Sequence, residues 1–269
     1  TGMCYNENCI DTMARMPDNF IDLTVTSPPY DNLRTYNGYS FDFEAVAKEL
    51  FRVTKDGGVV VWVVGDATIK GSETGTSFRQ ALFFKEIGFN LHDTMIWEKE
   101  SFSNPFHNRY HQVFEYMFVF SKGKLSTFNP VVDRKNKNSG KIVGSTVRES
   151  DGTLTPRSKK LIADYGKRFN VWKLTVQKQK GENVHPAPFP EQLANDHIIS
   201  WSNEGDLVYD PFMGSGTTAK MSILNNRNWI GSEISNEYCD IIEERVKKAW
   251  EEKRKEKDLQ AQTLFGIQD

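Results

Sequence analysis

Apolar residues in the first half of the chain follow two different periodicities. They recur at helical spacing over residues 43–53 and 77–87, whereas residues 59–64 form a continuous run rich in β-branched side chains. Such a run is typical of a parallel strand that is covered on both faces. We therefore predict strands and helices in alternation, with further strands at the following positions: 21–26, 94–97 and 113–120.

The same alternation returns near the end of the chain. Helical spacing over 189–201, 218–225 and 238–250 is interleaved with segments that predict short strands over 206–209 and 228–233. Strands that alternate with helices predict an α/β fold, in which a mostly parallel sheet carries helices on both faces. Ligands of such sheets bind beyond the carboxyl ends of the strands.

Residues between these two halves lack apolar periodicity and are rich in Gly, Ser, Asn and Lys. We predict an irregular insertion over 125–182 in a domain formed by 3–124 and 183–259, followed by a flexible tail over 260–269. Thr1 and Gly2 precede Met3 and are left out of the predicted fold, because they have the character of a cloning remnant.

Charge is distributed unevenly along the chain. The net charge of the whole chain is only −2, yet residues 133–182 hold 13 Lys and Arg against 5 Asp and Glu. A local basic excess predicts either a contact with phosphates or a solvated loop, and charge by itself does not separate the two.

Several classes of protein are disfavoured by composition. No apolar stretch approaches the roughly 20 residues that cross a bilayer, and no signal peptide is recognisable at the start. Cys4, Cys9 and Cys239 form neither a C-x-x-C pair nor an even set, so we expect no disulfide framework and no metal site. We expect a cytoplasmic protein without a membrane partner.

A glycine-rich turn between a predicted strand and a predicted helix, Gly214-Ser215-Gly216-Thr217-Thr218, indicates a nucleotide-type ligand. Its glycines allow a sharp bend and a close approach of the backbone, and Glu233 ends the next strand, where a carboxylate can bind ribose hydroxyls. The turn lacks the P-loop pattern and the complete dinucleotide pattern. S-adenosylmethionine, which has no pyrophosphate, is therefore the favoured ligand, and a plain βα turn is the alternative.

The turn Ser27-Pro28-Pro29-Tyr30 follows the first predicted strand and indicates chemistry on an amine. An exocyclic base amine is a poor nucleophile until hydrogen-bond acceptors localise its lone pair; the Ser27 hydroxyl and the Pro28 carbonyl are suitable acceptors. Tyr30 can stack on the base, which must leave the duplex to reach such a pocket. Attack on a ring carbon would need a cysteine nucleophile, and none of the three cysteines lies in a comparable turn.

Together these motifs resemble the β class of bacterial and phage DNA amino-methyltransferases over nearly the whole chain, with the catalytic motif preceding the cofactor motif. The resemblance implies a Rossmann-like class I methyltransferase fold with a seven-stranded sheet, one strand antiparallel, and an inserted target-recognition region. It also implies the catalytic residues Ser27, Pro28, Pro29 and Tyr30. The implied S-adenosylmethionine site comprises Asn8, Cys9, Thr26, Phe189, Glu191, Asp210, Pro211, Phe212, Gly214, Ser215, Gly216, Thr217, Thr218, Glu233 and Ile234.

Double-stranded DNA is the partner implied by the same resemblance. The residues expected on the DNA side are Arg34, Tyr36, Arg109, His111, Arg134, Lys135 and Lys137. For the first four, a role as ordinary surface residues is the alternative. A serine at the start of the catalytic motif is similar to N4-cytosine enzymes, so we predict N4-cytosine methylation, with N6-adenine methylation as the alternative. An RNA methyltransferase and a non-catalytic DNA-binding module are further alternatives, and a binding module would have no need of the Ser27 turn. Asn8 stands where the family often has aspartate.

The C-terminal residues 260–265 weakly resemble the peptide that docks on bacterial sliding clamps. A disordered end or a local packing contact is the alternative for this segment. We also consider a homodimer and expect a location at the nucleoid of a bacterial or phage-infected cell.

Overall fold

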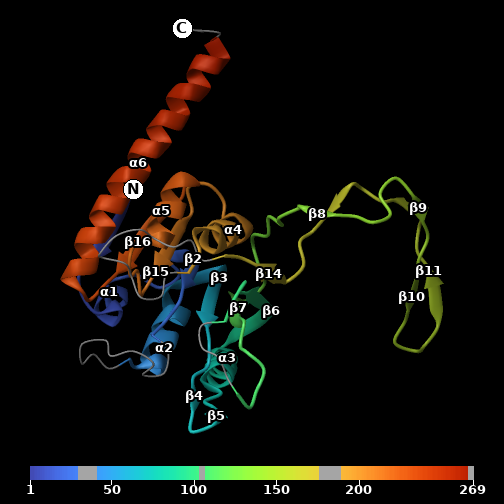
Figure 1. Cartoon of the computed structure of the whole chain (residues 1–269), viewed down its shortest axis with the longest axis horizontal. Helices are drawn as coiled ribbons and strands as arrows, with labels where there is room; N and C mark the ends of the chain where they lie inside the picture. The colour runs from blue at the N-terminus through green and yellow to red at the C-terminus, as the bar shows by residue number, and fades with distance from the viewer. Residues whose placement is uncertain (30–40, 103–106, 176–188, 266–269) are drawn as a thin grey trace. The chain divides into compact units, whose positions relative to one another are not determined.

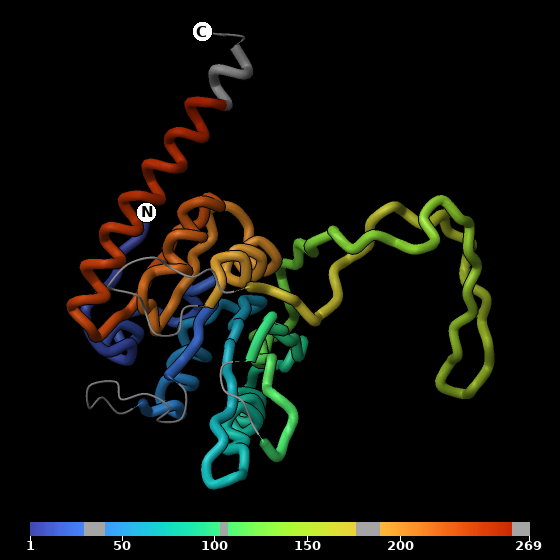
Figure 2. Tube along the Cα trace, viewed as in Figure 1, coloured from blue at the N-terminus to red at the C-terminus, as the bar shows by residue number. Residues whose placement is uncertain are grey.

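The computed structural model describes residues 1–29, 41–102, 107–175 and 189–265, and side chains up to residue 259. The chain forms two compact units, one of residues 1–129 and 170–269 and the other of residues 130–169. Figures 1 and 2 show the elements of each unit. No helix in the described part of the chain is long and apolar enough to span a bilayer.

The first unit is built on an eight-stranded sheet. The strands follow the spatial order β1 (Gly2–Tyr5), β16 (Asn228–Ser232), β15 (Leu207–Asp210), β2 (Ile21–Thr26), β3 (Thr54–Val64), β7 (Phe114–Lys122), β6 (Phe89–Glu98) and β14 (Val171–Lys173). Strand β7 is antiparallel to both of its neighbours, and the other pairs are parallel. The prediction of a mostly parallel sheet with one antiparallel strand is confirmed, but the predicted seven strands are eight.

Helices cover both faces of this sheet, as the strand β3 makes clear. Its residues Val60, Trp62 and Val64 pack against one set of helices: α1 (Cys9–Ala14), α2 (Phe43–Val53) and α3 (Thr76–Glu86). The alternate residues of β3 pack on the opposite face, which is covered by α4 (Glu191–Trp201) and α5 (Thr217–Leu224). Helix α6 (Asn236–Phe265) packs on α5 through Ile242 and Ala249.

Several predicted boundaries shift because tertiary pairing overrides local breakers. Strand β3 begins at Thr54, which pairs with Ile21; residues 55–58 form an irregularity in register before Val59 pairs with Leu23. Pro190 precedes α4 as its N-cap rather than lying in its first turn. Gly2, which we left out of the fold, pairs with Trp229 in β1. Helix α6 extends through residues 260–265, which we predicted to be a flexible tail; residues 266–269 lie outside the described residues.

The extra strand, β14, lies within the predicted insertion and returns the chain to the sheet. It pairs with β6, and its Trp172 side chain is only 5% exposed and stacks on the ring of His197, with 4.5 Å between ring centroids. The indole of Trp97 donates a hydrogen bond to the Leu174 carbonyl at 2.9 Å. Residues 170–175 therefore belong to the first unit, whereas we expected the insertion to run to residue 182.

We predict that Trp172→Ala destabilises the first unit by about 3–5 kcal/mol, because it removes a large buried side chain and leaves a cavity beside His197. Val171→Ala is the matched control, since Val171 lies in the same strand with 49% of its surface exposed. Chemical denaturation followed by tryptophan fluorescence measures both changes. Equal loss from the two variants would contradict the anchoring role of Trp172.

Candidate active site and nucleic-acid interface

The predicted catalytic and cofactor turns meet at one edge of the sheet. Strand β2 ends at Thr26 and β15 at Asp210, and the two strands are adjacent and parallel. The next strand, β16, pairs Gly231 with Asp210 and delivers Glu233 to the same edge. Because the carboxyl ends of parallel strands lie together, Ser27 and the glycine turn begin side by side.

Asp210 connects the two turns from within the protein. Its carboxylate accepts hydrogen bonds from the Thr26 hydroxyl at 2.6 Å, the Thr218 hydroxyl at 2.7 Å and the Phe212 amide at 3.0 Å. Burial raises the pKa of Asp210 from 3.8 to about 6, and these three donors oppose that shift. We predicted that Asp210 and Thr26 contact the cofactor; in the structure their side chains are hydrogen-bonded to each other.

The glycine turn is closed by Glu233, the predicted ribose-binding residue. Gly214 and Gly216 have φ values of 53° and 82°, which favour residues without a Cβ. The Glu233 carboxylate accepts hydrogen bonds from the amides of Gly214 at 2.8 Å and Ser235 at 2.9 Å. Burial raises the pKa of Glu233, while these amides oppose the shift. Each carboxylate oxygen retains a second acceptor direction for a ligand hydroxyl.

Glu191, a predicted cofactor residue, forms ion pairs with two basic side chains of the protein. It pairs with Lys220 of α5 at 2.9 Å and with Arg245 of α6 at 2.6 Å. Burial favours the neutral acid, but the hydrogen bonds from Arg245 and Lys220 prevail and lower the pKa of Glu191. Arg245 also donates to the Ser215 carbonyl at 3.1 Å, so this network supports the glycine turn from behind.

Arg245 is a supporting residue that the sequence analysis missed. It lies three residues after Ile242 and four before Ala249, both of which are buried on α6. An arginine within the apolar face of an amphipathic helix needs a buried partner. The position of Arg245 in the apolar pattern of residues 238–250 could therefore have indicated its supporting role.

The remaining predicted cofactor residues have local structural partners. The Asn8 side chain caps α1 by accepting from the Ile10 amide at 2.9 Å, and Cys9 packs in the core. Burial raises the pKa of Cys9 to about 12, which keeps it a thiol at neutral pH. Phe212 packs edge-on against Phe41, with 5.3 Å between ring centroids. Pro211 and Thr217 are buried in the turn, whereas Phe189 and Ile234 are half-buried near it.

The catalytic motif is described up to Pro29. Ser27 and Pro29 are half-buried and Pro28 is buried directly after β2. Tyr30, Arg34 and Tyr36 lie outside the described residues.

The predicted DNA-binding residues separate into two groups. Arg109 and His111 lie in the connection between β6 and β7, where Arg109 contacts a small hairpin and His111 stacks on Phe102. Arg134, Lys135 and Lys137 lie in the second unit, where Lys135 and Lys137 are exposed and Arg134 is half-buried.

The second unit is one long antiparallel ribbon with no buried residue. Its pairs are nested along the chain: β8 (Arg134–Lys135) with β13 (Tyr165–Gly166), β9 (Ile142–Val143) with β12 (Lys160–Leu161), and β10 (Thr146–Arg148) with β11 (Leu154–Pro156). Figure 2 shows the outgoing and returning segments of the ribbon running together to its tip. A two-stranded ribbon without a core is marginal in water by itself, which is typical of an element that is covered by a partner.

Basic residues have different roles along the ribbon. Near its base, Arg134 donates to the Lys167 carbonyl at 3.0 Å and lies over the Phe169 ring, and Arg168 pairs with Asp133. Toward the tip, four exposed side chains have no hydrogen bond or ion pair to any other described residue: Arg148, Arg157, Lys159 and Lys160. Arg134 and Arg168 near the base are thus tied internally, whereas Lys135, Lys137 and the distal charges are exposed to solvent.

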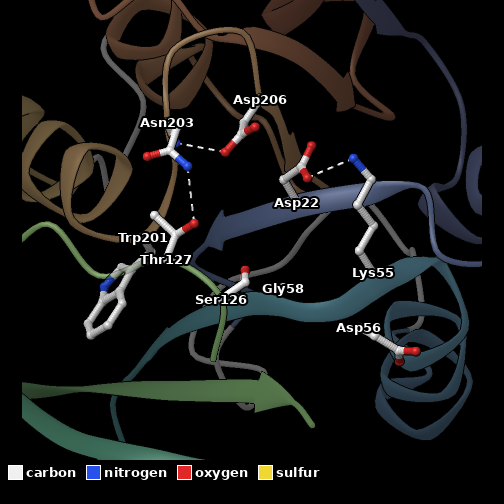
Figure 3. A pocket seen from close by; sticks show the side chains of 9 residues that line it. All are labelled: Asp22, Lys55, Asp56, Gly58, Ser126, Thr127, Trp201, Asn203 and Asp206. Atoms are coloured by element: carbon white, nitrogen blue, oxygen red, sulfur yellow. Dashed lines mark hydrogen bonds and ion pairs between the residues drawn. The ribbon is translucent and has the colours of Figure 1, made fainter. Parts of the chain in front are cut away.

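A cavity of about 220 Å³ lies at the opposite edge of the sheet, near the starts of β2, β3 and β15 (Figure 3). Its polar groups satisfy one another: Lys55 pairs with Asp22 at 2.7 Å, and the Asn203 amide donates to Asp206 at 2.7 Å. We assign it no catalytic role, because ligands of open α/β sheets bind at the carboxyl ends. No cluster of three or more metal-ligating side chains occurs among the described residues.

Asp210 makes the stability of the wild-type protein depend on pH. Because its folded pKa of about 6 lies above the ordinary 3.8, the folded state binds the proton more tightly; this contribution is greatest below pH 4 and is lost as pH rises through 6. We expect the unfolding free energy of wild type minus that of Asp210→Asn to fall by roughly 3 kcal/mol over this range, at 1.36 kcal/mol per pKa unit. Denaturant titrations at several pH values measure it, and a constant difference would contradict it.

Comparisons with known proteins agree with this arrangement. A family model described as DNA methylase, of the N6/N4 type, matches residues 21–244. The chain is 64% identical over 238 residues to the orphan methyltransferase M.BamHII of Bacillus amyloliquefaciens, covering 86% of this chain and 90% of that protein. It is 29% identical over 270 residues to the Type II beta methyltransferase M.BslI of a Bacillus strain, covering 88% of this chain but 26% of that longer relative.

Solved structures share the fold. The PvuII DNA methyltransferase, described as cytosine-N4-specific, superposes with a TM-score of 0.68 at 21% identity, covering 91% of this chain and 86% of that one. M1.HpyAVI in complex with S-adenosylmethionine gives a TM-score of 0.61 at 20% identity, covering 91% and 100%. The class I methyltransferase fold expected from the motifs is confirmed, and the chain belongs to the N6/N4 family of DNA methylases.

Proposed function

We propose that this DNA methylase transfers a methyl group from S-adenosylmethionine to the exocyclic N4 amine of a cytosine flipped out of double-stranded DNA. The observation that carries the proposal is the position of Ser27 beside the glycine turn, on adjacent strands that Asp210 ties together. Such a pair of turns brings an amine and a methyl donor into contact without a covalent enzyme intermediate.

The residues of the glycine turn fit the cofactor. Gly214 and Gly216 have positive φ values, which favour glycine and let the backbone bend sharply. Gly216 is the N-cap of α5 and makes no side-chain hydrogen bond, which leaves helix amides for a carboxylate. The Glu233 carboxylate is aligned by two amides and can accept ribose hydroxyls. When bound, S-adenosylmethionine supplies a methyl group on a sulfonium, and the carbon–sulfur bond breaks as the nitrogen–carbon bond forms.

Ser27 and Pro28 prepare the amine in this proposal. Their hydroxyl and carbonyl oxygens accept hydrogen bonds from the two amine hydrogens, which localises the nitrogen lone pair toward the methyl group. The amine loses one proton to solvent during or after transfer. Tyr30, which lies outside the described residues, is assigned stacking on the flipped base.

Cytosine is preferred over adenine because the motif begins with Ser27, and the PvuII structural relative is described as cytosine-N4-specific. N6-adenine methylation by the same residues is the alternative. Digestion of methylated duplex DNA to nucleosides, followed by mass spectrometry, identifies the product. N4-methylcytosine supports the proposal, N6-methyladenine selects the alternative, and product on RNA but not DNA contradicts both.

We predict that Ser27→Ala lowers kcat by about 10²-fold or more, because it removes an acceptor that is needed in the transition state. Binding of S-adenosylmethionine, measured by calorimetry, is expected to persist. Glu233→Ala is the matched comparison and is expected to weaken cofactor binding instead. Equal loss of both properties in Ser27→Ala would contradict its assignment to the amine.

We further propose that the ribbon of residues 130–169 is the target-recognition element. A two-stranded ribbon fits the major groove, and ten Lys and Arg against four Asp and Glu suit a phosphate-rich partner. Within it, the distal residues Arg148, Arg157, Lys159 and Lys160 are the preferred DNA contacts. Arg134 is assigned a structural role, because its guanidinium is engaged by Lys167 and Phe169.

Replacing these four distal residues by Gln is expected to weaken duplex binding and to reduce the slope of log K against log salt by as much as about 3.6, at 0.9 per phosphate contact. The charge-matched control replaces four exposed α6 residues by Gln: Lys247, Arg254, Lys255 and Lys257. Fluorescence anisotropy at several salt concentrations measures the slopes. Equal slopes for the two variants would contradict the recognition role of the distal ribbon.

The sliding-clamp contact of residues 260–265 and the homodimer stay predictions. Deleting residues 260–269 and measuring clamp binding tests the first.

A further inference from the structure

A small hairpin stands at the same edge of the sheet as Ser27. Strand β3 pairs Trp62 with Thr26, so Ser27 and the residues that follow Trp62 leave the sheet on neighbouring strands. The hairpin comes next in the chain and consists of β4 (Thr68–Ile69) and β5 (Ser72–Glu73) (Figure 1). Its tip begins at Lys70, six residues after Val64, and six extended residues reach at most about 20 Å from the end of β3. The same distance along a DNA duplex covers about six base pairs.

The hairpin is rigid for its size. Lys70 and Gly71 form its two-residue loop, and their φ values of 49° and 82° are those of a type I′ turn, which matches the twist of paired strands. At its base, the Thr74 amide donates to the Ala67 carbonyl at 2.9 Å. Asp66 accepts from the Ser77 amide at 2.9 Å and thereby fixes the hairpin to the first turn of α3.

Arg109 attaches a second segment to this hairpin. It donates to the Gly71 carbonyl at 2.5 Å and lies 3.6 Å from the Glu73 carboxylate. Arg109 belongs to the connection between β6 and β7, which also lies at this edge, because Val64 at the end of β3 pairs with Tyr116 near the start of β7. A guanidinium with these contacts positions the two segments relative to each other.

Two apolar side chains and one cation project from the joined segments without cover. Tyr110, next to Arg109, is 99% exposed, and Ile69 is 54% exposed beside the exposed Lys70. Holding an isoleucine of the hairpin and a tyrosine of the adjoining connection in water gives no folding benefit. Proteins that distort DNA insert apolar side chains between bases and surround them with cations that contact phosphates.

We propose that Ile69, Lys70 and Tyr110 form a probe that contacts the DNA duplex beside the extruded base and fills the space it leaves. Ile69 and Tyr110 replace the stacking that the flipped base gives up, and Lys70 contacts a phosphate. Arg109 is a positioning residue for the probe. This inference rests on the proposed function and adds to it the device that keeps the base out of the helix.

The test uses the double variant Ile69→Ala/Tyr110→Ala in the full chain, with Leu82→Ala as the matched control, since Leu82 is 64% exposed on α3. Methylation kinetics are measured on a duplex with a normally paired target base and on the same duplex with that base mismatched. A mismatched base costs less to extrude, so the mismatch substitutes for the probe. We expect kcat/KM to fall about tenfold or more on the paired duplex and to stay within about threefold of wild type on the mismatched one.

Three results would overturn the probe. They are unchanged kinetics on the paired duplex, equal losses on both duplexes, and a shift in oligomeric state with methylation intact, which would assign the exposed side chains to a contact between copies. Unaltered cofactor binding by the double variant shows that its fold is retained. A wild-type chain that methylates neither duplex would overturn the proposed function, and the probe with it, so the two failures are distinguishable.

Discussion

A buried carboxylate, that of Asp210, holds together the two turns to which the proposed methyl transfer is assigned. Burying a charge without partners costs several kcal/mol, so Asp210 is tolerated because three donors converge on it from β2, the glycine turn and α5. The raised pKa shows that these donors do not cancel the cost of burial. The buried carboxylate also fixes the alignment of the two strands, because a movement of β15 relative to β2 would break the hydrogen bond between Thr26 and Asp210.

Other charged residues at the site act behind the reacting groups in the same manner. Glu233 closes the glycine turn through amides, and Glu191 is fixed between Lys220 and Arg245 while Arg245 supports the Ser215 carbonyl. Three helices of one face are thereby tied to the turn. In the proposed reaction the chain forms no covalent bond, so preorganisation of this kind is expected to be its main contribution.

Arginines are divided between bracing and recognition. Arg109 and Arg134 were expected on the DNA side, yet their guanidinium groups engage neighbouring carbonyls and, for Arg109, a carboxylate. What they brace are a hairpin with an exposed tip and a ribbon with exposed distal charges. Because these contacts fix the orientation of each guanidinium, the exposed residues beyond it are the preferred candidates for contact with a phosphate.

The sequence by itself predicted most of the strands and helices of the first unit, although not β1, α1 or β14, together with the two turns and the family, because apolar periodicity and the positions of Gly and Pro are local properties. The sequence analysis did not predict that β14 joins the sheet, since Trp172 is buried by residues far away in the chain, among them His197 of α4. Nor did it reveal that Asp210 serves Thr26, that Asn8 caps a helix, or that Arg109 braces a hairpin. A motif shows that a polar side chain is needed at a position, but its hydrogen-bond partner is chosen by neighbours far away in the chain, and only the tertiary structure brings them together.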